Sequence, residues 1–374
     1  MNRLLEYCEA HADEIVADIE ALAGLESPST DKAAVDRCGM ELAARLRALG
    51  ADVDFLRREA RGDHVTAFWP GREPGVLILG HFDTVWAVGT LATMPVRRDG
   101  DRLSGPGVFD MKAGIAIALS AVRALQDGDV SRRAIRMLWT TDEEIGSGTS
   151  RGEIESAARQ SAAVLVLEPA LPGGALKTAR KGCGEYEVLV DGVAAHAGLD
   201  PGKGVSAIYE LADHVREIEA LSDLRRGTTV NVGIVEGGTR ANVVAAHARA
   251  VVDARAVTMA DAGRLDSALR KLQPKRPGAR LTVRGGFERP PLERSRDIAR
   301  LFATAQDIAR EFGRTLEEGT AGGGSDGNFT AAIGVPTLDG LGAVGDGAHA
   351  SHEHVTISDL PWRAALVAGL LNRL

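Results

Sequence analysis

The part of the sequence that most constrains the fold is residues 76–80, which read VLILG. Four apolar residues in succession, closed by a glycine, predict a central strand that is buried on both faces, because a strand with one exposed face would alternate apolar and polar residues. His81 and Asp83 come directly after this run. We therefore expect an imidazole and a carboxylate at the carboxyl end of a central strand.

Two later apolar runs also end in acidic residues. One leads into Asp142, Glu143 and Glu144, and the other leads into Glu168. In an open α/β sheet, ligands bind at the carboxyl ends of the strands. Acids gathered at that edge would repel one another unless a cation lies among them. The sequence therefore predicts a metal site at this edge.

Asp110 and a histidine-rich segment add further candidate ligands. Asp110 follows the tight turn Gly105-Pro106-Gly107, where glycine lets the backbone approach closely, and precedes a helix predicted for 111–126. Residues 349–354 contain three histidines, of which we expect at least one to be a ligand. A carboxylate-rich site with two histidines fits zinc or another divalent transition ion better than magnesium.

Each candidate also has an ordinary structural explanation. Asp110 could cap the helix that follows it, the acids at 142–144 could form a solvated turn, and Glu168 could be a surface residue. In the metal interpretation, Asp83 accepts the second N–H of His81 and fixes its tautomer. One of the two adjacent glutamates then binds the metal, and the other is free to act as a general base.

The spacing of apolar residues predicts the domain organisation. Strand and helix patterns alternate up to Glu168, starting with one amphipathic helix over 3–23, which is typical of a sheet covered by helices. Half-exposed strands and two amphipathic helices follow, as in a small α+β unit. We therefore predict an α/β fold, with a mixed, mostly parallel sheet flanked by helices and a smaller inserted α+β domain. The predicted boundaries are 1–178 and 292–374 for the metal-binding domain, and 179–291 for the inserted domain.

Composition excludes several classes of protein. The net charge of −8 leaves no basic stripe to neutralise phosphates, and no glycine-rich nucleotide motif follows a strand. No apolar run approaches the roughly 18 residues of a membrane span, and acids interrupt the N-terminal segment where a signal peptide is apolar. Cys8, Cys38 and Cys183 are too widely spaced for a CxxC metal motif or a disulfide framework. We expect a cytoplasmic protein without nucleic-acid or membrane partners.

Six separated motifs occur in an order that is typical of one group of enzymes. They are GHFDTV at 80–85, GPGVFDMKAG at 105–114, DEEIGS at 142–147, EP at 168–169, HAG at 196–198 and GAH at 347–349. The chain thereby resembles the co-catalytic zinc metallopeptidases that include glutamate carboxypeptidase (carboxypeptidase G), acetylornithine deacetylase, succinyl-diaminopimelate desuccinylase and aminoacylase. Residues 322–327, which read GGGSDG, are most similar to the glutamate carboxypeptidase branch.

The resemblance implies two zinc ions, replaceable by Co²⁺ or Mn²⁺. One ion would be held by His81 and Glu168, and the other by Glu144 and His349. Asp110 would bridge the two. Two ions in one site can polarise a scissile carbonyl and lower the pKa of a water molecule.

The resemblance also implies the catalytic residues. Glu143 would be the general base that delivers a proton to the leaving amine, and Asp83 would orient His81. His196, in the inserted domain, matches a histidine that these enzymes extend across a dimer to stabilise the oxyanion. An ordinary loop histidine is the alternative for His196.

Three further positions match those that bind the free carboxylate of the substrate: Asn242, Arg255 and Arg289. Guanidinium groups suit this role because they bind a carboxylate with two parallel hydrogen bonds. The alternative for both arginines is a surface salt bridge.

The resemblance as a whole implies a homodimer, formed through 179–291, that hydrolyses an amide bond next to a free carboxylate. The expected substrates are small N-acyl or peptidyl amino acids that end in glutamate or a similar residue. An N-acyl-amino-acid deacylase of the acetylornithine deacetylase or aminoacylase type is the alternative enzyme. A noncatalytic metal-binding protein is the alternative class, but it would not need Glu143 as a base.

Overall fold

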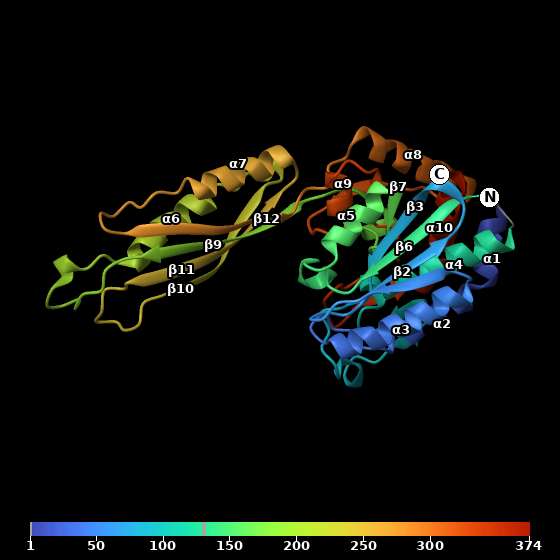
Figure 1. Cartoon of the computed structure of the whole chain (residues 1–374), viewed down its shortest axis with the longest axis horizontal. Helices are drawn as coiled ribbons and strands as arrows, with labels where there is room; N and C mark the ends of the chain where they lie inside the picture. The colour runs from blue at the N-terminus through green and yellow to red at the C-terminus, as the bar shows by residue number, and fades with distance from the viewer. Residues whose placement is uncertain (1, 129–131) are drawn as a thin grey trace. The chain divides into compact units, whose positions relative to one another are not determined.

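The computed structural model of the protein describes residues 2–128 and 132–374 (Figure 1). It has the mixed α/β architecture with an inserted unit that the sequence predicts, so the predicted fold class is confirmed. Within this described part of the chain, none of the helices combines the length and the hydrophobicity that a membrane span requires.

The chain divides into two compact units, which we call unit 1 and unit 2. Unit 1 contains the residues up to Ala179, together with Arg294–Ala321 and Ser325–Leu374. Unit 2 contains Arg180–Glu293 together with Gly322–Gly324. The chain therefore leaves unit 1, forms unit 2, and returns to complete unit 1.

Unit 1 is built on a sheet whose described strands lie in the order β1-β2-β6-β3-β7-β14. Strands β6, β3, β7 and β14 run parallel to one another, whereas β2 pairs antiparallel with both β1 and β6. The sheet is thus mixed and mostly parallel. The strand bounds are β1 Asp52–Leu56, β2 His64–Trp69, β3 Arg72–His81, β6 Arg133–Thr140, β7 Ser161–Val166 and β14 Thr337–Leu338.

The central strand β3 is buried on both faces, which explains its uninterrupted apolar sequence. Val76 and Ile78 belong to the core on one side of the sheet, and Leu77 and Leu79 belong to the core on the other side. This is the alternation expected of successive residues in a strand. Both faces therefore need helices to cover them.

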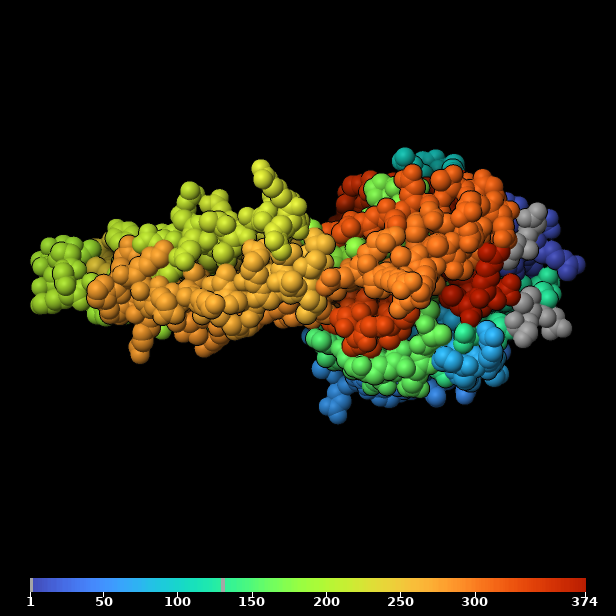
Figure 2. All heavy atoms as spheres, turned by 90° about the horizontal axis from the view of Figure 1, so that it is seen from above, coloured from blue at the N-terminus to red at the C-terminus, as the bar shows by residue number. Residues whose placement is uncertain are grey.

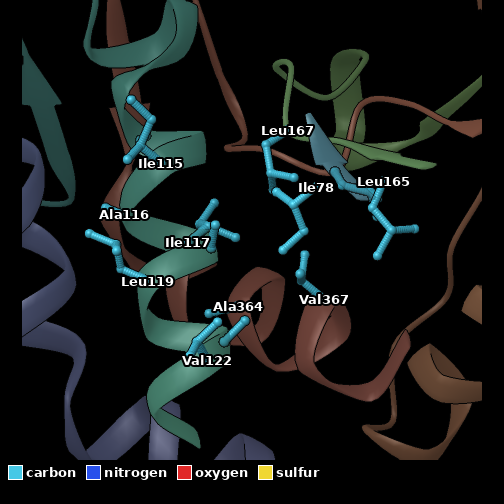
Figure 3. Close-up of a cluster of buried hydrophobic side chains, with 14 of the residues drawn as sticks. Ile78, Ile115, Ala116, Ile117, Leu119, Val122, Leu165, Leu167, Ala364 and Val367 are labelled. Carbon is cyan, nitrogen blue, oxygen red and sulfur yellow. The ribbon is translucent and has the colours of Figure 1, made fainter. Parts of the chain in front are cut away.

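Helices cover the two faces of the sheet (Figure 1). The larger core contains Ile78 of β3, Ile117 and Val122 of one helix and Val367 of another (Figure 3). The helices that contribute to this core are α1 Asn2–Ala10, α2 Ala12–Ala23, α3 Lys32–Ala48, α4 Ala113–Asp127, α8 Arg296–Glu311 and α10 Leu360–Arg373. The outer side of α8, in orange, is part of the surface in Figure 2. The opposite face is covered by α5 Arg151–Arg159 and α9 Gly327–Ala332.

The first predicted helix is interrupted. The sequence predicts one helix over 3–23, but the structure has α1 and α2, separated at His11. The imidazole Nδ1 of His11 lies 2.8 Å from the carbonyl oxygen of Tyr7, and the two rings stack. These local contacts compete with regular helix geometry, and the periodicity of apolar residues gives no sign of them.

Gly114 allows helix α4 to begin against the end of strand β7. A Cβ atom at Gly114 would stand 2.1 Å from the carbonyl oxygen of Leu167, so no larger residue fits. The contact fixes the start of α4, which follows Asp110, beside the segment that carries Glu168.

A second sheet of unit 1 joins two segments that are far apart in sequence. Its described strands lie in the order β15-β16-β5-β4. Strands β15 and β16 form an antiparallel hairpin, and β16 pairs with β5. The bounds are β4 Arg97–Asp99, β5 Arg102–Ser104, β15 Gly345–Asp346 and β16 His354–Thr356. A short pair is formed by β8 Leu176–Arg180 and β13 Glu318–Ala321.

Unit 2 is a four-stranded antiparallel sheet, in the order β10-β11-β9-β12 among the described strands, with two helices on one face (Figure 1). Burial alternates along β9 and β11. Tyr186, Val188 and Val190 pack in the helix-covered core, while the residues between them are less buried. The bounds are β9 Gly182–Asp191, β10 Thr229–Gly237, β11 His247–Ala256, β12 Arg280–Arg289, α6 Ala207–Glu219 and α7 Met259–Arg270.

Candidate metal centre

Three neighbouring parallel strands of unit 1 end in residues that can bind a cation. The order β6-β3-β7 places the carboxyl ends of these strands side by side. His81 is the last residue of β3, Glu143 and Glu144 follow β6, and Glu168 follows β7. Ligands are expected at this edge of an α/β sheet. Buried strands therefore place an imidazole between carboxylates from both of its neighbours.

Asp110 and His349 reach this edge from the β15-β16-β5-β4 sheet. Asp110 follows β5 after a turn at Gly107, whose φ is 72°. His349 lies in the connection between β15 and β16 with a φ of 62°. A left-handed backbone is unfavourable for a residue with a Cβ atom, and it is found mainly where the surroundings impose it.

Asp110 lies between the two histidines. Its Oδ1 is 3.2 Å from Nε2 of His81, and its Oδ2 is 3.3 Å from Nε2 of His349. The Oε1 atom of Glu168 is 3.4 Å from Nε2 of His81, and the Oε2 atom of Glu144 is 3.0 Å from Nε2 of His349. The five side chains therefore form two groups that share the carboxylate of Asp110.

The donor atoms of this cluster fit a bound cation. The Nδ1 atom of His81 is 3.0 Å from the carbonyl oxygen of Asp83, which places the ring proton on Nδ1 and leaves the Nε2 lone pair facing carboxylate oxygens. Within residues 2–128 and 132–374, His81 Nε2, Asp110 Oδ1 and Glu144 Oε1 are buried without a hydrogen-bond partner. Lone pairs that face one another are repulsive, so a positive charge must lie among them.

Without a metal ion, the pKa values of the cluster show how strongly it attracts protons. Hydrogen bonding to Asp110 and Glu144 raises the pKa of His349 to about 10. Burial opposes the charge of His81, but Asp110, Asp83 and Glu168 together raise its pKa well above the usual value. Burial raises the pKa of Glu144. Protons and metal ions thus compete for the same positions.

Asp83 is held in place by groups that the sequence did not single out. Its Oδ2 accepts a hydrogen bond from the hydroxyl of Ser29 at 2.7 Å and one from the main-chain N–H of Glu144 at 3.3 Å. Its carbonyl oxygen and, at 3.4 Å, its Oδ1 both face Nδ1 of His81. Asp83 therefore links the loop after β3 to the loop after β6.

The three consecutive acids after β6 point in different directions. Carboxylate atoms of Glu143 and Glu168 and a ring nitrogen of His81 lie within 4.8 Å of one another. The same holds for His81, Asp110 and Glu144. The Oδ2 atom of Asp142 instead accepts hydrogen bonds from the main-chain N–H and the hydroxyl of Thr149, at 2.6 and 2.7 Å. Asp142 thus shapes the loop, while both glutamates face the cluster.

His196 and Asn242 lie together in unit 2. The main-chain N–H of Ala197 donates to the carbonyl oxygen of Asn242 at 2.9 Å, and His196 pairs with Val243. Both His196 and Asn242 are exposed. The Nδ1 atom of His196 accepts hydrogen bonds from two main-chain N–H groups, those of residues 198 and 199. The proton of the neutral imidazole must therefore be on Nε2.

Arg255 and Arg289 lie in one row across the sheet of unit 2. Both are in register with Cys183 of β9, the strand between them. The sequence did not predict that Cys183 lies beside these arginines. The guanidinium of Arg255 contacts the Cys183 Sγ at 2.6 Å and makes hydrogen bonds of 2.8 to 3.0 Å with both carboxylate oxygens of Asp253. A Cβ atom at Gly324 would lie 2.9 Å from the side chain of Arg289 and 3.1 Å from Cys183 Sγ. The thiol and the two guanidinium groups thus share one face.

Residues 77–373 match peptidase family M20/M25/M40, so the chain belongs to that family. It is 32% identical to carboxypeptidase G2 of Pseudomonas sp. (strain RS-16), over 99% of this chain and 91% of the relative. It is 30% identical to the succinyl-diaminopimelate desuccinylase of Gluconacetobacter diazotrophicus, over 89% of this chain and 90% of that enzyme. The fold is similar to that of aminopeptidase PepT from Bacillus cereus, with a TM-score of 0.80, 23% identity, and coverage of 96% and 98% of the two chains.

The predicted family is therefore confirmed, and the chain is a hydrolase that acts on peptide or amide bonds. The family is metal-dependent, and the cluster around Asp110 provides a possible metal-binding site in this chain.

Zinc binding to the metal-free protein should release protons. The raised pKa of His349, about 10, means that its imidazole carries a proton at neutral pH, whereas a metal ligand must be neutral. We expect the zinc affinity to increase with pH up to the pKa of His349, about 10. Calorimetric titrations in buffers of different ionisation enthalpy should give binding enthalpies that depend on the buffer.

The matched variants are His349→Ala and His352→Ala. His352 is an exposed neighbour of the same loop, so its replacement should leave the number of released protons unchanged. His349→Ala should lower that number. A binding enthalpy that is the same in every buffer would contradict the expectation.

Proposed function

We propose that the protein is a dinuclear zinc hydrolase that cleaves an amide bond next to a free carboxylate. In this proposal it acts as a carboxypeptidase and releases C-terminal glutamate, or a similar amino acid, from N-acyl or peptidyl substrates. The observation that carries the proposal is the position of Asp110, with its two oxygens 3.2 and 3.3 Å from two different histidines. The similarity to a protein named carboxypeptidase G2 supports the kind of substrate. The second candidate is an N-acyl-amino-acid deacylase, which is supported by the similarity to a desuccinylase.

The donor atoms divide naturally between two ions. His81 and Glu168 would hold one zinc ion, Glu144 and His349 would hold the other, and Asp110 would bind both. Co²⁺ or Mn²⁺ should be able to replace zinc, because the same nitrogen and oxygen donors suit them. Two such ions would polarise the amide carbonyl and lower the pKa of water.

Glu143 is the proposed general base. It takes a proton from the attacking water on a carboxylate oxygen and then gives it to the nitrogen of the leaving amine. Its place among His81 and Glu168 supports this role, because all three offer atoms within 4.8 Å of one another. Asp83 would keep the Nδ1 proton of His81 in place, so that Nε2 remains available as a ligand.

His196 is the proposed donor to the oxyanion. Because its Nδ1 accepts two main-chain hydrogen bonds, its Nε2–H can donate to an oxygen that becomes negative during the reaction. The imidazole can do this in its neutral form, without changing protonation state.

Asn242, Arg255 and Arg289 are the proposed carboxylate-binding residues. Arg255 has most of its donors engaged by Asp253, so its charge is largely compensated within unit 2. Arg289 is only 7% exposed, and desolvated guanidinium groups form the stronger pairs with carboxylates. Its low exposure is the reason to test carboxylate binding at Arg289.

The proposed homodimer would form through unit 2. Strand β10 is an edge strand that exposes Ile234 and Val235, the latter to 57%. Ile208 and Tyr209 of the adjacent helix α6 are also exposed. A cavity of about 530 Å³ is lined by Ile208 and Tyr209 of α6, by Gly237 at the end of β10 and by the loop that follows β10. An open edge with apolar residues favours pairing with an identical edge of a second copy. A twofold axis then pairs the free main-chain groups and buries the apolar residues of both edges together.

The general base can be tested by comparing two neighbouring residues. Glu143→Gln should retain two zinc ions but lose about 10³-fold or more in turnover, because proton transfer has no acceptor. Metal content by mass spectrometry and kcat on an N-acyl glutamate are the measurements.

Glu144→Gln is the matched control, since it changes the adjacent residue in the same way. This variant should lose zinc as well as turnover. A Glu143→Gln enzyme that keeps more than about a tenth of the wild-type turnover would remove the base assignment.

Replacement of Arg289 should weaken binding only of substrates that have a free carboxylate. A charge-assisted hydrogen bond contributes about 1.5–3 kcal/mol, so Arg289→Ala should raise the KM for these substrates by roughly 10-fold to 100-fold. The KM for the corresponding amidated substrates should change little.

Arg284→Ala controls for loss of a positive charge, because Arg284 is an exposed residue of the same strand.

Chemical labelling of Cys183 gives a second test of the same carboxylate-binding position. Cys183 is the one cysteine of the three that is not buried, so iodoacetamide should label it first, and free glutamate should slow the labelling. Equal loss on free and amidated substrates would refute carboxylate recognition by Arg289.

The proposed dimer surface can be tested with one charged residue. Val235→Lys should convert a dimer into a monomer, because it puts a charge on the apolar edge strand. Light scattering coupled to size-exclusion chromatography measures the mass. Met259→Lys, at a similarly exposed apolar residue of unit 2, should leave the dimer intact. A monomeric wild-type protein would contradict the proposal.

A further inference from the structure

Glu353 is a buried carboxylate that holds the loop carrying Asp110. It accepts four hydrogen bonds, and three come from main-chain N–H groups of that loop: Gly107 at 3.0 Å, Phe109 at 2.9 Å and Asp110 at 3.0 Å. The fourth comes from the indole N–H of Trp86 at 2.8 Å. The carbonyl oxygen of Glu353 also accepts the N–H of Gly105 at 3.2 Å.

The same residue belongs to the segment that carries His349. Glu353 is the last residue before β16, and its N–H donates to the carbonyl of Ala350 at 2.9 Å. The N–H of Ala350 in turn donates to the carbonyl of Gly347 at 2.8 Å. His349 lies inside this short chain of hydrogen bonds. Glu353 therefore joins the backbone around His349 to the backbone around Asp110.

The hydrogen bonds of Glu353 hold the main chain at Asp110, which the contacts of the Asp110 side chain do not hold. The loop before Asp110 contains two glycines with positive φ, Gly105 and Gly107, so it has little conformational preference of its own. A carboxylate that accepts several main-chain N–H groups orders such a loop, because charge-assisted hydrogen bonds are strong and directional. The oxygens of Asp110 can then remain 3.2 Å from His81 and 3.3 Å from His349.

We propose that Glu353 is a positioning residue of the metal centre, which sets Asp110 between His81 and His349 and thereby determines how tightly the two ions are held. The inference rests on the proposed dinuclear function. Groups behind metal ligands act in this way by fixing ligand orientation, and their loss typically lowers metal affinity by about 10-fold to 100-fold.

Glutamine at position 353 is a sharp test because it has nearly the same shape. Oε1 of Glu353 accepts from Phe109 and Asp110, and Oε2 accepts from Gly107 and Trp86. A glutamine amide can satisfy one of these pairs with its oxygen, but its NH₂ group then faces the two donors of the other pair. The loop must shift to separate them.

Glu210→Gln is a matched control in unit 2. Glu210 is also fully buried and also accepts four hydrogen bonds, from the main-chain N–H groups of Lys275 and Arg276, the guanidinium of Arg276 and the imidazole of His214. Its replacement should cost a similar amount of stability without touching the metal centre. The pair of variants therefore separates positioning from ordinary structural support.

The experiment is a zinc competition titration with a chromogenic chelator on the full-length wild-type protein and both variants, together with the Tm of each metal-free form. We expect both variants to lower the Tm of the metal-free protein. Zinc affinity should fall by about 10-fold to 100-fold in Glu353→Gln and stay within about twofold of wild type in Glu210→Gln. If Glu353→Gln does not fold, Trp86→Phe removes a single donor and should lower the zinc affinity by a smaller factor.

The possible failures are distinguishable. Wild-type zinc affinity in Glu353→Gln, or an equal loss in Glu210→Gln, would overturn the positioning role and leave the proposed function intact. A wild-type protein that binds no zinc would overturn the proposed function, and the positioning role with it.

Discussion

The mutual repulsion of buried carboxylates is the physical constraint on which the rest of unit 1 depends. Asp110, Glu144 and Glu168 place oxygens within 3.4 Å of imidazole nitrogens. In the described part of the chain, His81 Nε2, Asp110 Oδ1 and Glu144 Oε1 are buried without a hydrogen-bond partner. Negative charge in a medium of low polarity is costly unless an opposite charge lies next to it. The pKa of His349 is raised because its imidazole faces the carboxylates of Asp110 and Glu144, so in the absence of a metal ion the cluster favours a bound proton. A divalent ion would compensate the same carboxylate charges and carries twice the charge of a proton.

The scaffold that holds these charges together is rigid, because it consists of strands buried on both faces. Three neighbouring strands, β6, β3 and β7, end at the same edge, and the side chains below that edge are packed between two layers of helices. Gly114 lets α4 pack directly against the end of β7, since any larger residue would push the two apart. Repulsion at the site therefore cannot be relieved by moving the strands apart, whereas a bound cation would relieve it.

Much of this could be predicted from the sequence, because the informative residues lie at the ends of regular elements. The VLILG run identifies β3 as a central strand, and His81, Glu144 and Glu168 follow predictable strands. The strand pattern alone does not give the contact between Asp110 and His349, which only the family resemblance implied, because it depends on β5 and β16, which have three residues each and no distinctive pattern. The break at His11, the separate direction of Asp142 and the engagement of Arg255 by Asp253 are likewise set by single hydrogen bonds or ion pairs, which hydrophobic periodicity does not encode.

Hydrogen-bond donors near the site are distributed unequally, and this inequality favours the binding of a cation. Main-chain N–H groups and hydroxyls go to the outer carboxylates: Glu353 accepts from Gly107, Phe109 and Asp110, and Asp83 accepts from Ser29 and Glu144. The main-chain N–H of Asp110 is thereby used by Glu353, so it does not compensate the charge of an inner carboxylate. The outer anions Glu353 and Asp83 are stabilised by these donors. Asp110 and Glu144 instead face imidazole nitrogens and are stabilised by positive charge, either from a proton on His349 or from a bound cation. The hydrogen-bond donors thus leave Asp110 and Glu144 available to bind a cation.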